Sequence, residues 1–156
     1  MNSKYLTLSG RIKQEISEIK TCIDRAKKAW NRAKESSDPL YLDSVALNLH
    51  DFYSSLERVF ELIAENVDET KPTGGNWHQE LLRQMATEIP KIRPAVISQD
   101  LKQKLDEYRA FRHIVRNVYA HHFKAERIEK LVENIDELIK ATEEELLNFC
   151  NFLEET

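Results

Sequence analysis

Residues that interrupt helices are scarce in this sequence. Only three of its 156 residues are glycine and four are proline. They fall almost wholly in three short clusters, within residues 36–39, 68–76 and 89–98. Because glycine and proline mark turns and end helices, we expect turns at these clusters and long uninterrupted elements between them.

Cysteines and long apolar runs are also scarce. Cys22 and Cys150 are too few for a disulfide framework or a zinc signature, and we expect both to be structural thiols. No apolar run exceeds three residues, which argues against a membrane-spanning helix and against a signal peptide. We therefore expect a cytoplasmic protein with no membrane partner.

The composition is that of a folded domain. Hydrophobic residues make up 41% of the chain and charged residues 32%, a balance that excludes a disordered chain. This length suits one core, so we expect a single domain over residues 1–156. The net charge of -4 argues against indiscriminate coating of nucleic acid, although a net value can conceal a local basic patch.

Apolar residues recur every three or four positions in three long segments, as they do along the buried face of an amphipathic helix. The stripes are Tyr5, Leu8, Ile12, Ile16, Ile19, Ile23, Ala26 and Trp30; Val45, Leu49, Phe52, Leu56, Val59, Ile63 and Val67; and Ile128, Leu131, Ile135, Leu138, Thr142, Leu146, Phe149 and Leu153. No stretch longer than four residues alternates as a strand would. The sequence predicts an all-α, up-and-down bundle of four long helices plus a short helix near residues 76–88.

The C-terminal third needs a break that no glycine or proline marks. Residues 98–155 contain neither, yet one helix of that length does not fit so small a domain. Cations favour the carboxyl end of a helix and anions the amino end. Because basic residues give way to acidic residues near residue 124, we predict the break between His121 and Arg127.

Charge is segregated around that predicted break. Residues 102–124 hold six Lys or Arg against two acids, a balance of +4, whereas residues 125–156 hold three against ten, a balance of -7. Three of the five histidines also lie in the basic window. On a continuous helix one polar ridge would consist of residues four apart, with Arg112 and Arg116 on the adjoining ridge. The members of that first ridge are Arg109, His113, Asn117 and His121.

This basic window has three possible interpretations. It could be a solvated helix face. A metal site of His113, His121 and His122 is disfavoured because no carboxylate or thiolate lies between the histidines, so we expect no metal. Histidine transfers protons near neutral pH and arginine binds phosphate oxygens with two parallel bonds, so the pair suits metal-independent phosphodiester cleavage.

The run from Phe111 to His121 resembles the signature of HEPN domains. That signature places an arginine and a histidine four to six residues apart, commonly with a polar residue after the arginine. Arg116, Asn117 and His121 fit it, with four residues between the arginine and the histidine.

Further segments look like the HepT-like group of HEPN proteins. They are Asn76–Leu82 (NWHQELL), the turn from Pro90 to Pro94, and Glu107–His113 (EYRAFRH). The resemblance covers roughly residues 45–155. It implies a ribonuclease without cofactors that acts as the toxin of a toxin-antitoxin pair, with RNA as substrate and tRNA or mRNA as the candidates.

The resemblance also implies roles for the motif residues. The RNA 2′-hydroxyl would attack the adjacent phosphate, with His121 as general base or acid and Arg116 stabilising the crowded phosphate. Asn117 would orient His121 or bind a phosphate oxygen. Arg112 and His113 would make secondary substrate or interface contacts.

The spacing of the motif bears on the implied homodimer, in which two motif helices meet across a cleft. Arg116 and His121 lie about 140° apart around a regular helix, so they do not share a face unless the helix breaks. A two-fold interface would supply the missing convergence.

The implied partner is a minimal nucleotidyltransferase (MNT) antitoxin. Related toxins often carry a tyrosine two residues after the motif histidine, to which the antitoxin attaches AMP. This sequence has Phe123 there, without a hydroxyl. Such a partner would therefore use another acceptor, such as Tyr119, or act by binding alone.

Two further features leave alternatives open. Trp77 and His78 follow a Gly-Gly loop and begin the short helix; Trp77 is interpreted as a core anchor beside the motif helix, with stacking on an RNA base as the alternative. The rival to the ribonuclease is a helical adaptor or nucleotide-binding regulatory module, in which the basic window binds a ligand without catalysis.

Overall fold

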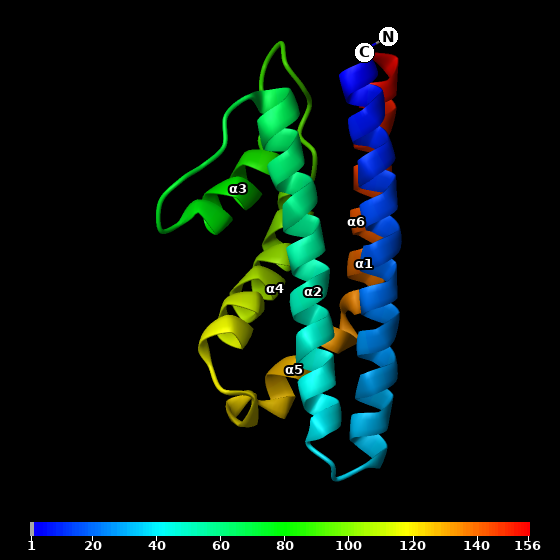
Figure 1. Cartoon of the computed structure of the whole chain (residues 1–156), viewed down its shortest axis with the longest axis vertical. Coiled ribbons are helices and arrows are strands. Elements are labelled where there is room, and N and C mark those ends of the chain that lie inside the picture. The colour runs from blue at the N-terminus through cyan, green and yellow to red at the C-terminus, as the bar shows by residue number, and fades with distance from the viewer. Residues whose placement is uncertain (1) are drawn as a thin grey trace.

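A computed structural model describes residues 2–156, with the backbone alone at residue 120, and the chain folds into helices joined by short connections (Figure 1). The helices are α1 (Ser3–Glu35), α2 (Leu40–Ile63), α3 (Trp77–Met85), α4 (Gln99–Asn117), α5 (Ala125–Glu133) and α6 (Ile135–Glu155). A π-helical turn, Ala64–Asp68, extends α2, and a 3-10 turn, Ala120–His122, precedes α5. No strand occurs in the described residues, so the predicted all-helical bundle is confirmed.

The two longest helices form an antiparallel hairpin. Helix α1 ends at Glu35, next to the turn predicted within residues 36–39, and Asp38 Oδ1 accepts a hydrogen bond of 2.9 Å from the Leu40 N–H at the start of α2. This side chain satisfies an amide that the first turn of a helix leaves unpaired. The predicted stripe is buried along α1 from Leu8 to Ala26, which gives the hairpin its apolar seam.

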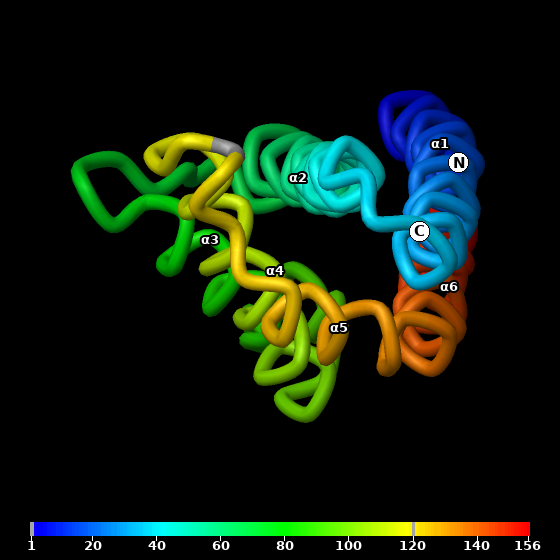
Figure 2. The backbone as a smooth tube through the Cα atoms, turned by 90° about the horizontal axis from the view of Figure 1, so that it is seen from below, coloured from blue at the N-terminus to red at the C-terminus, as the bar shows by residue number. Residues whose placement is uncertain are grey.

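Helix α6 packs antiparallel to α1 and also contacts α4 and α5 (Figure 2). Three ion pairs fix this register: Lys13 with Glu154 at 2.8 Å, Lys20 with Glu143 at 3.1 Å, and Lys27 with Asp136 at 2.7 Å. The two chain ends consequently lie side by side at one end of the molecule (Figure 1).

A buried ion pair organises the connection between α2 and α4. Arg93 Nε donates to Asp68 Oδ1 at 2.6 Å and Arg93 Nη2 to Asp68 Oδ2 at 2.8 Å, with both side chains inaccessible to solvent. Arg93 also donates to the carbonyl oxygens of Gln84, Thr87 and Pro94. Since a buried charge is tolerated only when its hydrogen bonds are satisfied, this clamp fixes both ends of the connection.

The structure corrects the predicted end of the basic helix. Helix α4 ends at Asn117, Val118 is extended (φ -128°, ψ 143°), and α5 begins at Ala125. His121 therefore lies in the 3-10 turn, and its predicted place on the ridge of Arg109, His113 and Asn117 was wrong. The chain turns back at this point, and the Tyr108 hydroxyl of α4 donates to the Leu131 carbonyl oxygen of α5.

The final helix is also divided where one long helix was predicted. Asn134 separates α5 from α6 with φ -98° and ψ 2°, and its side-chain amide donates to the Lys130 carbonyl oxygen at 2.9 Å. An asparagine that bonds to its own backbone competes with helix propagation. The described chain thus has a second short helix that the apolar periodicity did not reveal.

Candidate functional site

The loop after α4, residues 118–124, carries the histidine of the Arg-His motif and is called the motif loop below. Both of its flanks are anchored. The buried hydroxyl of Tyr108 on α4 donates to the Leu131 carbonyl oxygen on α5, and burial raises the pKa of this hydroxyl. The Phe123 ring packs near the Phe111 ring, with a distance of 6.1 Å between the two ring centroids. The loop is therefore a short exposed turn between fixed ends.

Arg116 and His121 are both exposed, one in the last turn of α4 and the other in the 3-10 turn of the motif loop. The helix break separates them, so the angular constraint of a regular helix no longer applies to the pair. Among the described residues, neither side chain takes part in a hydrogen bond or an ion pair. Both are available to a ligand.

Aromatic rings surround His121. The Tyr119 ring lies nearly parallel to the imidazole, with centroids 5.7 Å apart and planes at 14°, and His122 lies edge-on at 4.2 Å. Tyr119 is 73% exposed. A ring that is stacked on one side and open to solvent on the other suits stacking against a nucleobase.

Asn117 does not contact His121 in the structure. Its side-chain amide instead donates to the His113 carbonyl oxygen at 2.7 Å and lies 3.4 Å from His113 Nδ1. The contact through which Asn117 was expected to orient His121 is thus not formed within this chain. His113 and Asn117 are both exposed and extend the polar surface of α4 beside Arg116.

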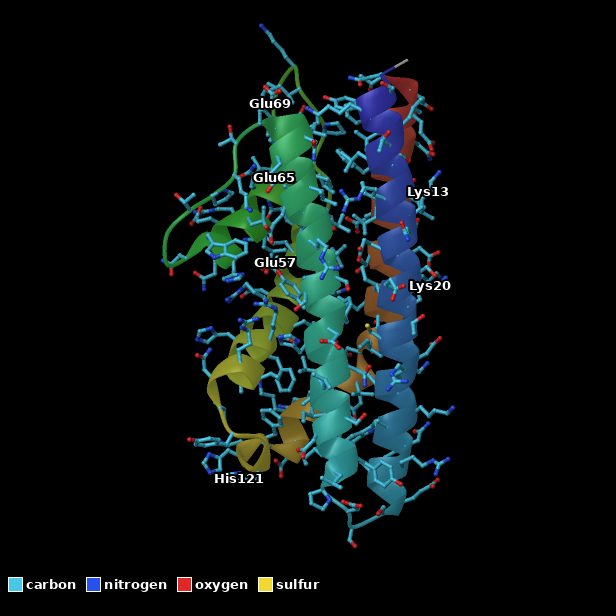
Figure 3. The ribbon with its side chains drawn as sticks, viewed as in Figure 1. Lys13, Lys20, Glu57, Glu65, Glu69 and His121 are labelled. Atoms are coloured by element: carbon cyan, nitrogen blue, oxygen red, sulfur yellow. The ribbon has the colours of Figure 1, made fainter. Side chains whose placement is uncertain are left out.

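Arg112 and His78 belong to a different cluster, centred on a carboxylate. Glu57 of α2 is only 3% exposed; its Oε2 lies 2.7 Å from His78 Nδ1 and its Oε1 3.9 Å from Arg112 Nη1. Arg112 Nε also donates to Ser54 Oγ at 2.8 Å. The cluster joins α2, α3 and α4, with Glu57 on the inner side of α2 (Figure 3).

Sequence reasoning missed Glu57, although a signal was present. Tyr53, Glu57, Phe60 and Ala64 occupy one row of α2 at steps of three or four, and Glu57 is the one charged residue in that row. An acid within an apolar row predicts a buried carboxylate that needs a cationic partner. Nothing in the local pattern indicated which helices supply the partners.

Trp77 lies at the edge of the core, as expected of a core anchor, and Arg109 is paired on its own helix. The Trp77 ring is partly buried against the core, 3.6 Å from the His78 ring, with Lys71 Nζ 5.9 Å from its centroid. It anchors α3 at the edge of the core. Arg109 pairs with Asp106 at 2.7 Å on its own helix.

Two negative findings apply to the part of the chain that the structure describes. No group of three or more His, Cys, Asp or Glu side chains is arranged as a metal site. No helix is both long and apolar enough to cross a bilayer.

The fold and the motif loop define an all-helical protein that exposes an arginine and a histidine on either side of a helix break. The chain belongs to the HepT-like protein family, whose sequence profile matches residues 44–153. This membership confirms the resemblance drawn from the sequence and relates the chain to HEPN nucleases. No curated protein and no solved structure gives a significant match.

Proposed function

We propose that this protein is a metal-independent endoribonuclease and the toxin of a toxin-antitoxin pair, with Arg116 and His121 as its catalytic residues. The observation that carries the proposal is the exposure of these two side chains, free of partners among the described residues, on the two sides of the α4 break. Membership of a family related to HEPN nucleases supports the reaction class.

The proposed reaction uses the nucleophile that RNA carries. A base removes the proton of the 2′-hydroxyl, and the oxygen attacks the adjacent phosphorus. The bond from phosphorus to the 5′-oxygen breaks, and an acid returns a proton to that oxygen. The products are a 2′,3′-cyclic phosphate and a 5′-hydroxyl, so RNA is a substrate and DNA is not.

Each motif residue has a role suited to its chemistry. His121 acts as the base or the acid, since imidazole exchanges protons near neutral pH. Arg116 binds the phosphate oxygens as negative charge accumulates on them. Asn117, His113 and Tyr119 border this pair and would contact the substrate or the second subunit.

A homodimer would complete the cleft. Large apolar side chains are exposed at the motif end of the molecule: Leu40 and Leu47 on the first half of α2, and Val118 and Tyr119 in the motif loop. Leu40 and Leu47 are two turns apart and share a face of α2. Contact between two such surfaces would bury them and bring two copies of the motif together.

The proposed antitoxin is a nucleotidyltransferase that acts at Tyr119. Phe123 occupies the position of the usual acceptor, is partly buried and packs on Phe111, whereas the Tyr119 ring is exposed and stacked on His121. An AMP group on the Tyr119 hydroxyl would cover the imidazole. The test is the mass of the toxin after incubation with the antitoxin and ATP: wild type should gain one AMP and Tyr119→Phe none. Inhibition without a mass change would show that the antitoxin acts by binding alone.

The proposed activity is tested by growth and RNA integrity after induced expression of wild type, Arg116→Ala and His121→Ala. Wild type should arrest growth and fragment RNA, including in extracts assayed with a chelator, and both variants should do neither. Arg127→Ala, which removes an exposed cation from α5, is the control and should behave as wild type. Normal growth and intact RNA with folded wild-type protein would instead favour the adaptor.

A further inference from the structure

A second basic feature lies away from the motif, in the groove between the end of α1 and the start of α2. The groove has a volume of about 290 Å³ and is lined by three cations, two hydroxyl-bearing residues and one alanine. These are Arg25, Lys28, Arg32, Tyr41, Ser44 and Ala29. No carboxylate is among these lining residues, all of which the structure describes.

The cations of the groove are not neutralised from within the chain. Their neighbour Lys27 faces α6 and pairs with Asp136, whereas Arg25, Lys28 and Arg32 have no ion-pair partner among residues 2–156. Arg25 is nevertheless held in place, because its Nε donates to Asn48 Oδ1 at 3.3 Å and Asn48 Nδ2 donates to the Ser44 carbonyl oxygen at 2.8 Å. The groove therefore presents an arginine held by a hydrogen bond beside two cations that have no partner among the described residues.

These side chains match a phosphodiester chain. Arginine donates two parallel hydrogen bonds to phosphate oxygens, lysine adds a point charge, and hydroxyl groups of tyrosine and serine donate single bonds. A small anionic metabolite binds best in a closed pocket that surrounds it, whereas an open groove between two helices suits an extended polyanion.

The groove lies at the same end of the molecule as the motif. Figure 3 places His121 at the end where α1 turns into α2. Figure 2 shows the motif loop on one side of α2 and α1 on the other. An RNA strand with its scissile phosphate at Arg116 and His121 could therefore continue across α2 towards α1.

Most of this groove is outside the segment that matches the family. The match begins at residue 44, so Ser44 is the one lining residue within it, and α1 supplies the whole cationic wall. The groove is thus a property of this chain that family membership does not supply.

We propose that the α1–α2 groove is an RNA-backbone subsite, in which Arg25, Lys28 and Arg32 bind phosphates of the strand that is cleaved at the motif. The proposal rests on the proposed function insofar as RNA is the ligand of the motif. It makes the groove a determinant of substrate length: RNA long enough to reach both sites binds more tightly than a fragment confined to the motif.

The test measures binding of fluorescein-labelled single-stranded RNA by anisotropy over a series of salt concentrations, in a His121→Ala background that prevents cleavage. Lys28→Gln/Arg32→Gln should raise Kd about tenfold for a 20-nucleotide strand and leave a four-nucleotide strand unaffected. A plot of the logarithm of the binding constant against the logarithm of the salt concentration has a negative slope. Removing two phosphate contacts should make this slope shallower by about 1.4, since each contact on a single strand contributes about 0.7. With His121 restored, KM should rise while kcat is retained.

The matched control is Lys4→Gln/Arg11→Gln, which removes two cations from the same helix, at the far end of the same α1–α2 interface. These residues lie about 26 to 42 Å along α1 from Lys28 and Arg32, at 1.5 Å per residue. The control should change Kd less than twofold. Circular dichroism and the midpoint of thermal unfolding should show that both double variants fold.

The outcomes separate this proposal from the proposed function. Equal effects of the two double variants, or none from Lys28→Gln/Arg32→Gln, would overturn the subsite while leaving cleavage at the motif intact. If Lys28→Gln/Arg32→Gln selectively lost RNA binding but the wild-type protein cleaved no RNA, the subsite would be retained and the ribonuclease proposal would be wrong. If Lys28→Gln/Arg32→Gln lost the antitoxin but kept RNA, the groove would bind an acidic protein and the RNA proposal would be wrong.

Discussion

At the scale of single residues, the buried carboxylate of Glu57 has the largest structural role near the motif. It lies within 4 Å of His78 and Arg112 and so connects three helices. Arg112 was expected to make secondary substrate or interface contacts, but in the structure both Arg112 and His78 face Glu57. They position α3 and α4, and α4 in turn positions Arg116.

Truncation of Glu57 should therefore destabilise the fold. Glu57→Ala leaves Arg112 without a compensating charge in a largely buried site, and we expect a loss of about 3 kcal/mol in the free energy of unfolding. Urea denaturation measures it. The control is Glu65→Ala in the π-helical turn that extends α2. It removes an exposed carboxylate paired with Lys71 and should cost less than about 1 kcal/mol. Equal costs would show that the buried cluster does not stabilise the protein.

Tyr53 gives a second prediction at this scale. Its ring is fully buried and its hydroxyl has no hydrogen-bond partner among the described residues. Since an unpaired buried hydroxyl is unfavourable, Tyr53→Phe should stabilise the protein by about 1 kcal/mol at neutral pH, as measured by urea denaturation. A destabilised variant would mean that the hydroxyl finds a partner, such as water.

The same residue predicts a dependence on pH. Burial, followed by the charge of nearby Glu57, raises the pKa of Tyr53 in the folded protein, whereas an unfolded tyrosine ionises near pH 10. The folded state then holds the proton that the unfolded state loses, so stability falls as pH rises above about 10. The advantage of Tyr53→Phe over wild type should widen between pH 8 and pH 10.5, and a constant difference would contradict the shift.

At the scale of helices and loops, the motif loop depends on the contact between α4 and α5. Tyr108→Phe removes the buried hydrogen bond to the Leu131 carbonyl oxygen and should cost about 1 to 2 kcal/mol. Hydrogen exchange should become faster in residues 118–131. Tyr5→Phe, a change of the same kind on the partly buried Tyr5 of α1, should leave this exchange unchanged. If exchange does not change in Tyr108→Phe, the loop is held by Phe123 instead.

The helices were largely predictable and the connections were not. The stripes from Leu8 to Ala26 and from Val45 to Ile63 are buried as predicted, because each helix contributes one apolar face to one core. The break after Asn117 was placed too late, since charge along a helix says little about where packing forces a turn. The Asp68–Arg93 clamp was not predictable, because it joins residues 25 positions apart in a connection without periodicity.

The sequence predicted which residues form the motif, but it did not predict the contacts that several of the site residues make. The spacing of Arg116 and His121 identified the motif, and the structure leaves both exposed. The contact of Asn117 with His113 and the burial of Arg112 depend on which helices meet, and a single sequence does not encode that in any local pattern.

At the scale of the whole molecule, the proposed dimer yields a prediction on α2. Leu47 is 56% exposed, so Leu47→Glu should leave the monomer folded while placing two charges in a two-fold interface. We expect light scattering to show a dimer for wild type and a monomer for Leu47→Glu, with RNA cleavage lost. Ile92→Glu, at a residue 45% exposed in the connection before α4, is the control and should remain a dimeric nuclease. A dimeric and active Leu47→Glu protein would exclude this face.

The clamp between Asp68 and Arg93 spans an exposed segment that includes Gly74 and Gly75, and Glu57 meets His78 across the same segment. A backbone cut there would leave α1 and α2 on one fragment and the Arg-His motif on the other. Buried charges, the Glu57 cluster and the seam between α1 and α6 would still join the pieces. The protein is therefore suited to being split at this loop into two fragments, each inert by itself. Their reassembly would restore the proposed nuclease and make its proposed toxicity a reporter of their association.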